Sequence, residues 1–202
     1  MKPFVSCQLN EFVTQFSLHP PAAQAWPDFA WHKSAVLIPV RQGRSELEVI
    51  LTRRTPHLRH HASQICFPGG RMDASDPCLQ YTALRETQEE IGLAPQQVDI
   101  IGQLPEQPVL SRFMIQPYLG VVTSESPFYL ATDEVAEVLT VPLRVLLDQR
   151  NHLQVKRNDP LYPTVHFIPW QGQLIWGATA AIIRTLADQM NPQGKHLYTP
   201  VF

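Results

Sequence analysis

The residues of this chain whose spacing most directly suggests a chemical site are three glutamates, Glu86, Glu89 and Glu90. On a helix, positions i, i+3 and i+4 fall on one stripe, so the three carboxylates would lie side by side. Like charges at this spacing repel each other, and a cation bound over the stripe would relieve the repulsion. Mg²⁺ favours carboxylate oxygens. Taken alone, the spacing is still more often that of a solvated acidic helix face.

The helix that would carry these glutamates has predicted ends. Asp76 is suited to the N-cap and Pro77 to the first helical position, where no N–H is needed. Gly92 stands where a left-handed C-terminal cap is expected. In this helix Arg85 and Gln88 would point away from the glutamates. The apolar pattern predicts a buried face made of Ala83, Leu84, Thr87 and Ile91.

The segment before the helix favours a binding site over a solvated surface. Phe67-Pro68-Gly69-Gly70 reads as a turn that follows a strand, so strand, loop and capped helix form one unit. Glycines allow the backbone to approach a ligand closely. Gly69 and Gly70 could therefore supply a carbonyl to a metal or leave room for a diphosphate.

The whole unit resembles the Nudix box, Gly-x5-Glu-x7-Arg-Glu-U-x-Glu-Glu-x-Gly-U, where U is a bulky apolar residue. Asp76 replaces the first glutamate of the box and stands one residue too far from Arg85, and Thr87 replaces an apolar residue. The positions that match are Arg85, Glu86, Glu89, Glu90, Gly92 and Leu93.

Residues 50–70 are similar to the signature of the coenzyme A-type Nudix hydrolases, Leu-Leu-Thr-x-Arg-Ser-x-x-Leu-Arg-x-His-x-Gly-Gln-Val-x-Phe-Pro-Gly-Gly. The loop pattern Gly-Gly-x-x-Asp-x-x-Asp, ending at Asp76, and the extra residue also belong to that subfamily. Ser63 stands where the signature has glycine. If this position needs a positive φ, Ser63 would strain the turn.

The resemblance implies an α/β protein with the Nudix fold, a mixed β-sheet sandwiched between α-helices. It implies a hydrolase dependent on Mg²⁺ or Mn²⁺ that cleaves the diphosphate of coenzyme A or acyl-coenzyme A. The products would be 4′-phosphopantetheine, or its acyl form, and adenosine 3′,5′-bisphosphate. One alternative is a Nudix hydrolase of another nucleoside diphosphate derivative, such as ADP-ribose or a dinucleotide. Another is a non-catalytic, nucleotide-binding regulator, which would have no need of clustered carboxylates.

The resemblance also implies roles for single residues. Glu86 and Glu90 are expected to bind the metal directly, and Glu89 to act as a third ligand or as a base through water. Arg85 is expected to orient the glutamates. A base outside the box is the alternative, with Glu134, Asp133 or Glu106 as candidates. We expect substrate to be bound by Arg53, Arg59, His60, Gly69 and Gly70, although a solvated basic loop explains each of the cationic residues equally well.

Composition agrees with a soluble enzyme. Of the 202 residues, 44% are hydrophobic and 17% charged, and the formal net charge is −2, so neither a nucleic acid nor a membrane is an expected partner. Three cysteines without metal-binding spacing and no apparent signal segment point to the cytoplasm. We expect one Nudix domain over 1–202, with a core at about 31–190 and a short N-terminal helical extension. A homodimer, the acyl-chain preference and the number of metal ions stay open.

Hydrophobic periodicity predicts the remaining elements. Gln42-Gly43-Arg44-Ser45 indicates a hairpin, and Pro117 suggests that its strand lies at an edge or carries a bulge. Helices are expected at 9–16, 77–91, 142–147 and 178–190. Strands are expected at 34–40, 47–52, 65–67, 98–104, 115–122, 135–141, 152–156, 165–168 and 174–176.

Overall fold

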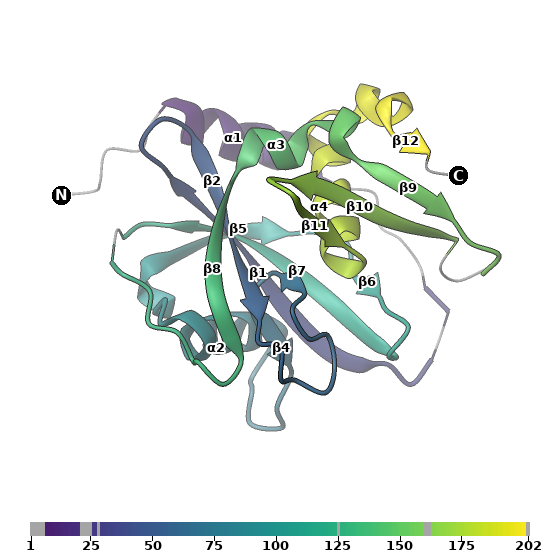
Figure 1. Cartoon of the computed structure of the whole chain (residues 1–202). Helices are drawn as coiled ribbons and strands as arrows, with labels where there is room; N and C mark the ends of the chain where they lie inside the picture. The colour runs from purple at the N-terminus through teal and green to yellow at the C-terminus, as the bar shows by residue number, and fades with distance from the viewer. Residues whose placement is uncertain (1–6, 21–25, 28, 125, 160–162, 201–202) are drawn as a thin grey trace.

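The computed structural model describes residues 7–20, 26–27, 29–124, 126–159 and 163–200 (Figure 1). Four α-helices are present in these residues: α1 (Cys7–Leu18), α2 (Leu79–Ile91), α3 (Leu143–Leu147) and α4 (Ala178–Met190). The strands of the main sheet are β1 (His32–Gln42), β2 (Leu47–Arg54), β3 (Ile65–Cys66), β4 (Gly69–Arg71), β5 (Val98–Gln103), β6 (Gln107–Pro108), β7 (Phe113–Val122) and β8 (Val135–Pro142). A second sheet contains β9 (Leu153–Lys156), β10 (Thr164–Trp170), β11 (Gln173–Trp176) and β12 (Thr199–Pro200).

The main sheet is mixed, as expected. Its central order is β3-β2-β1-β7-β5, with β1 and β7 parallel and the β1–β2 hairpin antiparallel. The hairpin closes where the sequence predicted, through a bond from the Gly43 N–H to the Glu46 carbonyl. The short strand β4 pairs with the start of β1 and brings the Gly69-Gly70 turn onto the sheet.

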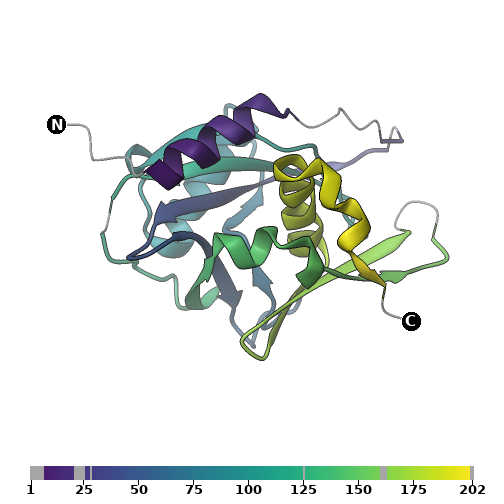
Figure 2. The same ribbon diagram turned by 90° about the horizontal axis from the view of Figure 1, so that it is seen from above.

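Two hydrophobic clusters show that the sheet is covered on both faces. Alternate residues of β1 and β2 point to opposite sides, as strand geometry requires. Ile38 and Leu51 join a cluster with α1, α3 and α4. Leu37 and Ile50 join a second cluster with α2. Figures 1 and 2 show α2 on one side of the sheet and the other helices on the opposite side, which confirms the predicted sandwich.

The prediction that the strand with Pro117 lies at an edge is wrong. β7 is central, between β1 and the pair β5 and β6, and the register shift near it lies in β5, between Ile100 and Gly102. Pro117 is tolerated because it lies where the pairing passes from β5 to β6, and its carbonyl accepts a bond from the Leu104 N–H. The sequence also gave no sign of β4, β6, β12 or the short 3-10 helices at Pro95–Gln97, Gln149–Asn151 and Pro192–Leu197.

The other expectations about the chain concern its surroundings. No helix among the described residues is long and apolar enough to cross a membrane. All three cysteines are free thiols. The expectation about a signal segment rests on the first residues of the chain, and residues 1–6 lie outside the described part.

Candidate active site

Helix α2 is fixed against β1 and β4 by its buried face. Ala83 and Ile91 are completely buried, and Thr87 lies beside them, so that part of the predicted face is confirmed. Leu84, which was predicted to be buried, is only half-buried. The expected left-handed cap is confirmed too: Gly92 has φ 73° and donates its N–H to the Gln88 carbonyl. The buried face also includes Glu90, a carboxylate that the sequence pattern placed beside the core rather than in it.

The predicted beginning of α2 is wrong. The helix begins at Leu79, and Cys78, not Asp76, is its N-cap. The Asp76 carboxylate turns back into the loop, where it accepts bonds from the Asp73 N–H at 3.0 Å and from the Thr82 hydroxyl at 2.9 Å. It therefore holds the loop 71–78 on the helix without capping it.

Arg85 connects the loop that carries Asp76 to the glutamates of α2. Its Nε and Nη2 each lie 3.0 Å from one oxygen of Asp76, in a two-pronged pair. The same guanidinium lies 2.9 Å from Glu86 Oε1 and 2.8 Å from Glu89 Oε2. The expectation that Arg85 points away from the glutamates is therefore wrong. Hydrogen bonds from Arg85 lower the pKa of Asp76 to about 2, and the same pairing raises the pKa of Arg85.

Glu90 has much weaker partners. Its side chain is 5% exposed, its Oε2 accepts the Gly69 N–H at 3.3 Å, and its Oε1 lies 3.8 Å from Arg54 Nη1. Burial is the main cause that raises the pKa of Glu90 to about 8; Gly69 and Arg54 oppose the shift, and Glu86 and Glu134 add to it. Desolvation without a close counter-charge disfavours the ionised form.

Glu86 lies directly against the Gly70 backbone. A Cβ added at Gly70 would come within 2.4 to 2.6 Å of the three carboxylate atoms of Glu86, so any side chain at position 70 would force that carboxylate to move. Burial raises the pKa of Glu86, although Arg85 counteracts it, and Glu89 and Glu134 add negative charge. The negative charge of Glu134, one of the candidate bases, contributes to the raised pKa of both Glu86 and Glu90.

The chemistry of Glu86 and Glu90 fits a hard divalent cation. Two partly desolvated carboxylates face the same glycine turn with incomplete compensation, and oxygen donors of this kind suit Mg²⁺ or Mn²⁺. Among the described residues, no three His, Cys, Asp or Glu side chains converge into a ready-made metal cage. Glu89 does not complete one, because its side chain is 58% exposed and paired with Arg85. Water and substrate oxygens would have to supply the remaining ligands.

The basic residues that precede the Gly69-Gly70 turn have different surroundings. Arg53 is bound to Glu137, to the Ser63 carbonyl and to Gln173 of β11, whereas Arg54 faces Glu90. Adjacent strand residues point to opposite faces, and this alternation was the signal that could have separated them. Arg54 Nε is buried and has no hydrogen-bond partner among the described residues. Arg59 and His60 lie exposed on the loop 55–64.

Ser63 does adopt the backbone conformation that raised the question of strain. Its φ is 60°, and His61, in the same loop, has φ 58°. Non-glycine residues rarely occupy this region. Ser63 stands where the signature has glycine, and its backbone adopts a conformation that glycine occupies more readily.

Two further candidate bases lie in loops. Asp133 accepts a bond from the Thr55 hydroxyl through its backbone carbonyl, and Glu106 accepts one from Trp26 in the same way. Both side chains are exposed. Of the three candidates, Glu134 is the one whose negative charge contributes to the raised pKa of Glu86 and Glu90.

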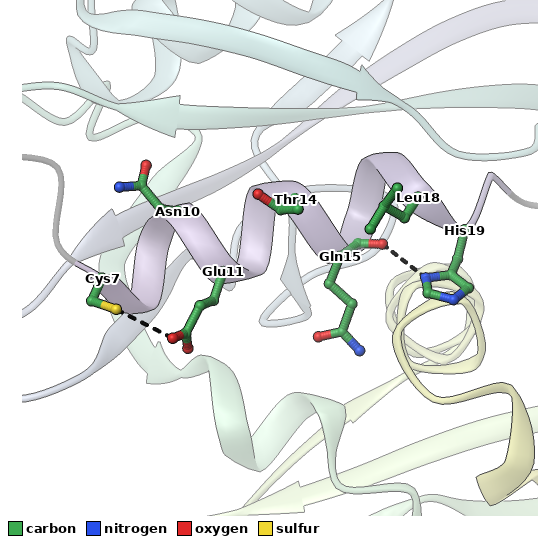
Figure 3. Close-up of a pocket in the computed structure, with 7 residues that line it drawn as sticks. All are labelled: Cys7, Asn10, Glu11, Thr14, Gln15, Leu18 and His19. Atoms are coloured by element: carbon green, nitrogen blue, oxygen red, sulfur yellow. Dashed lines mark hydrogen bonds between the residues drawn. The ribbon is translucent and has the colours of Figure 1, made fainter.

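A hollow lies along α1, and the residues that line it differ in chemistry from those around Glu86 and Glu90. Figure 3 shows the residues that line it, among them Cys7, Glu11 and His19. Glu11 accepts a bond from the Cys7 thiol, and His19 is bonded to the Gln15 carbonyl. One carboxylate on an exposed helix face does not make a metal site, and Figure 1 shows α1 on the opposite side of the sheet from α2.

The NUDIX domain is the known family that matches this chain, over residues 31–165, which is more than half of its length. The protein belongs to the Nudix family. It is 36% identical to a Nudix hydrolase of Pectobacterium atrosepticum over 94% of this chain and 98% of its relative. It is 38% identical to one of Yersinia enterocolitica over 91% of this chain and 93% of its relative. Both relatives carry the name "uncharacterized Nudix hydrolase NudL".

Solved structures agree on the Nudix fold. The MutT protein from Methanosarcina mazei superimposes with a TM-score of 0.52 at 19% identity, covering 82% of this chain and 96% of the other. This Nudix protein is therefore a hydrolase that acts on nucleoside diphosphate derivatives. Nudix hydrolases generally use divalent metal ions such as Mg²⁺ or Mn²⁺.

Proposed function

We propose that this Nudix hydrolase uses Mg²⁺ or Mn²⁺ to cleave the diphosphate of coenzyme A or acyl-coenzyme A. Water adds across the P–O–P linkage: its oxygen joins one phosphorus atom, and the bond from the bridging oxygen to that phosphorus breaks. One product is 4′-phosphopantetheine, acylated when the substrate is, and the other is adenosine 3′,5′-bisphosphate. The three free thiols suit a reducing compartment, so we place the reaction in the cytoplasm.

The observation that carries the hydrolytic part is the position of Glu86 and Glu90 against the Gly69-Gly70 turn. Glu90 accepts the Gly69 N–H, and Glu86 occupies the space that a Gly70 side chain would need. A divalent ion held there would polarise phosphoryl oxygens and lower the pKa of a bound water. Glu86 and Glu90 would hold the ion, and Glu89 could join them once it separates from Arg85.

Arg85 would act as a positioning residue. Through Asp76 it is anchored to the loop, and through Glu86 and Glu89 it fixes the direction of the acidic side chains. Glu134 would accept the proton of the attacking water, a role supported by its contribution to the raised pKa of both Glu86 and Glu90. Glu89 is the alternative base, because it lies on the same helix stripe and is exposed to solvent.

The coenzyme A part of the proposal rests on the signature-like segment 50–70. Ser63, which stands where the signature has glycine, has a positive φ, a conformation that glycine adopts readily, and this is consistent with the resemblance. Arg59 and His60, exposed on the loop 55–64, are available to bind the phosphates of the substrate, and Arg54 adds a cation beside Glu90. Arg53, which is already paired with Glu137, would support the loop rather than bind substrate.

A substrate panel tests the proposal. The protein is incubated with Mg²⁺ or Mn²⁺ and with coenzyme A, acetyl-coenzyme A, ADP-ribose or NADH, and the products are identified by mass. We expect coenzyme A or its acetyl form to be hydrolysed fastest. Faster hydrolysis of ADP-ribose or NADH would overturn the substrate class. Tight binding of one compound without turnover of any would instead indicate a nucleotide-binding regulator.

A further inference from the structure

The second sheet has an uncovered apolar face. In β10, Val165, Phe167 and Pro169 alternate with residues that point toward α4. Directly paired residues of neighbouring strands point to the same side, and the register places β9 and β11 residues beside these three. Within β9, β10 and β11 this face consists of seven apolar side chains: Leu153, Val155, Val165, Phe167, Pro169, Leu174 and Trp176. Thr199 of β12, which pairs with Leu153, lies at its edge.

These seven residues do not contribute to the interior of the protein. The opposite face of the sheet is covered, since Ile168 and Ile175 are completely buried and belong to the core cluster with α4. None of the seven outer residues belongs to either hydrophobic cluster. Leu174 is 45% exposed and Trp176 is 44% exposed. In Figures 1 and 2, α4 lies on one side of the sheet, and no helix or strand of the described chain covers the other.

Such a face normally has a partner. An antiparallel sheet of a soluble protein usually packs one face on the core and exposes polar side chains on the other. A contiguous exposed apolar patch marks an interaction site. The face is one side of an open β-sheet, whereas small-molecule sites are typically clefts or cavities. These features favour a protein surface as the occupant over an acyl chain or a nucleobase.

We propose that this face, which we call the outer sheet face, binds the same face of a second copy of the chain in a twofold dimer. A twofold interface needs only one self-complementary patch. Within β9, β10 and β11 the outer sheet face has no charged side chain, so the central parts of two copies can meet without like charges opposing each other. Two apolar sheet faces commonly pack with strands within about 30° of each other and about 10 Å apart.

The size of the face sets the expected strength. The seven residues of β10 span roughly 23 Å, and three strands give a width of about 14 Å. This is enough for the apolar centre of an interface that buries about 800 Å² per partner, with surrounding polar residues as its rim. The exposed cations Lys156 and Arg157 lie at one end of the face. We expect a dimer with a dissociation constant on the order of micromolar.

Sedimentation velocity on the full chain tests the dimer, between about 1 and 200 µM. The wild-type protein should move from monomer mass toward twice that mass as its concentration rises. Leu174→Glu should remain monomeric at the highest concentration, because it places a charge on the outer sheet face. Leu110→Glu is the control: it changes a leucine outside the face that is 62% exposed, against 45% for Leu174. Circular dichroism should show that both variants are folded.

Two results would overturn the proposal. One is a wild-type protein that stays monomeric at 200 µM, on the order of a hundred times the expected dissociation constant. The other is Leu174→Glu associating as strongly as Leu110→Glu. The dimer does not depend on the proposed substrate, since it is measured by mass alone. A second variant, Trp176→Glu, repeats the test from a different strand position if Leu174→Glu does not fold.

Discussion

Asp76 and Glu90 are buried carboxylates of the same motif, and their surroundings are opposite. Asp76 receives four hydrogen bonds: two from Arg85, one from Thr82 and one from the backbone of Asp73. Glu90 receives one long bond from Gly69 and has Arg54 at 3.8 Å. The pKa of Asp76 falls to about 2, and that of Glu90 rises to about 8. A satisfied carboxylate stabilises a fold, whereas an under-compensated one is suited to bind a cation.

The difference follows from Arg85. Its guanidinium uses its donors on Asp76, Glu86 and Glu89, and none reaches Glu90. The loop that carries Asp76 is therefore a structural clamp, and Glu90 is left without a close counter-charge from Arg85. This division predicts that changes at Glu90 affect turnover, while changes at Asp76 affect stability first.

The largest effect is expected at Glu90. Glu90→Gln should lower kcat on the order of 10²-fold or more, because it removes a ligand charge from the reacting centre. Thermal unfolding should be almost unchanged, since glutamine keeps the shape and can accept the Gly69 N–H. Glu48→Gln is the control, because Glu48 is a partly buried glutamate paired with Arg41 away from the site. Retention of more than about a tenth of the activity in Glu90→Gln would contradict its role as a ligand.

The next largest effect is expected at Asp76, and on stability. Asp76→Ala should lower the free energy of unfolding by about 3 kcal/mol, because it leaves the Arg85 and Thr82 donors without their partner. Chemical denaturation measures this loss. Asp73→Ala, at a side chain that is 65% exposed and 3.8 Å from Arg85, should change stability by less than about 0.5 kcal/mol. Equal losses in both variants would show that Asp76 is not the anchor of the loop.

A smaller effect on activity is expected at Gly70. Gly70→Ala places a methyl group where the Glu86 carboxylate lies, and should lower kcat about tenfold by displacing that carboxylate. In Gly43→Ala the new Cβ would meet the Glu48 carboxylate at 2.6 Å, so it imposes a similar clash far from the site. Gly43→Ala should retain its activity. If the two variants lose activity equally, the contact between Gly70 and the Glu86 carboxylate does not contribute to catalysis.

The pH dependence of the unfolding free energy tests the contribution of the Asp76–Arg85 pair. The pKa of Asp76 is lower in the folded protein, about 2, than its usual value of 3.8. Its contribution is therefore complete above the unfolded pKa and is lost as pH falls through 3.8 toward 2. The difference in unfolding free energy between wild type and Asp76→Asn should be constant from about pH 6 to 5 and shrink by pH 3. A constant difference throughout would contradict the lowered pKa.

The smallest effect is expected at Ser63. Ser63→Gly removes the strain of the positive φ, worth about 1 kcal/mol. It also raises the conformational entropy of the unfolded chain, which costs a similar amount of stability. We expect a net change within about 0.5 kcal/mol in the unfolding free energy and unchanged kcat. Ser63→Val should destabilise the protein by more than 1 kcal/mol, on the order of the cost of a β-branched residue at positive φ. Equal stability of the glycine and valine variants would show that the loop is not held in this conformation.

Local geometry is the part of this protein that the sequence by itself determined. Hydrophobic periodicity located the long strands and the helices, because alternation and the 3.6-residue repeat record which side chains are buried. The spacing of Glu86, Glu89 and Glu90 on one helix and the left-handed cap at Gly92 both follow from neighbours a few residues away. Short strands such as β4 and β6 left no such record, since two or three residues show no period.

Tertiary structure decided the electrostatics of the site and the outer sheet face. Arg85 turns toward the carboxylates because Asp76 reaches it across the loop, a contact that helix geometry alone does not specify. Arg53 and Arg54 separate because different strands and helices cover their two faces. Burial of Glu90 depends on packing against a strand segment about twenty residues earlier in the sequence. The apolar outer face emerged only from the register of β9, β10 and β11, which pairs residues that are distant in the chain.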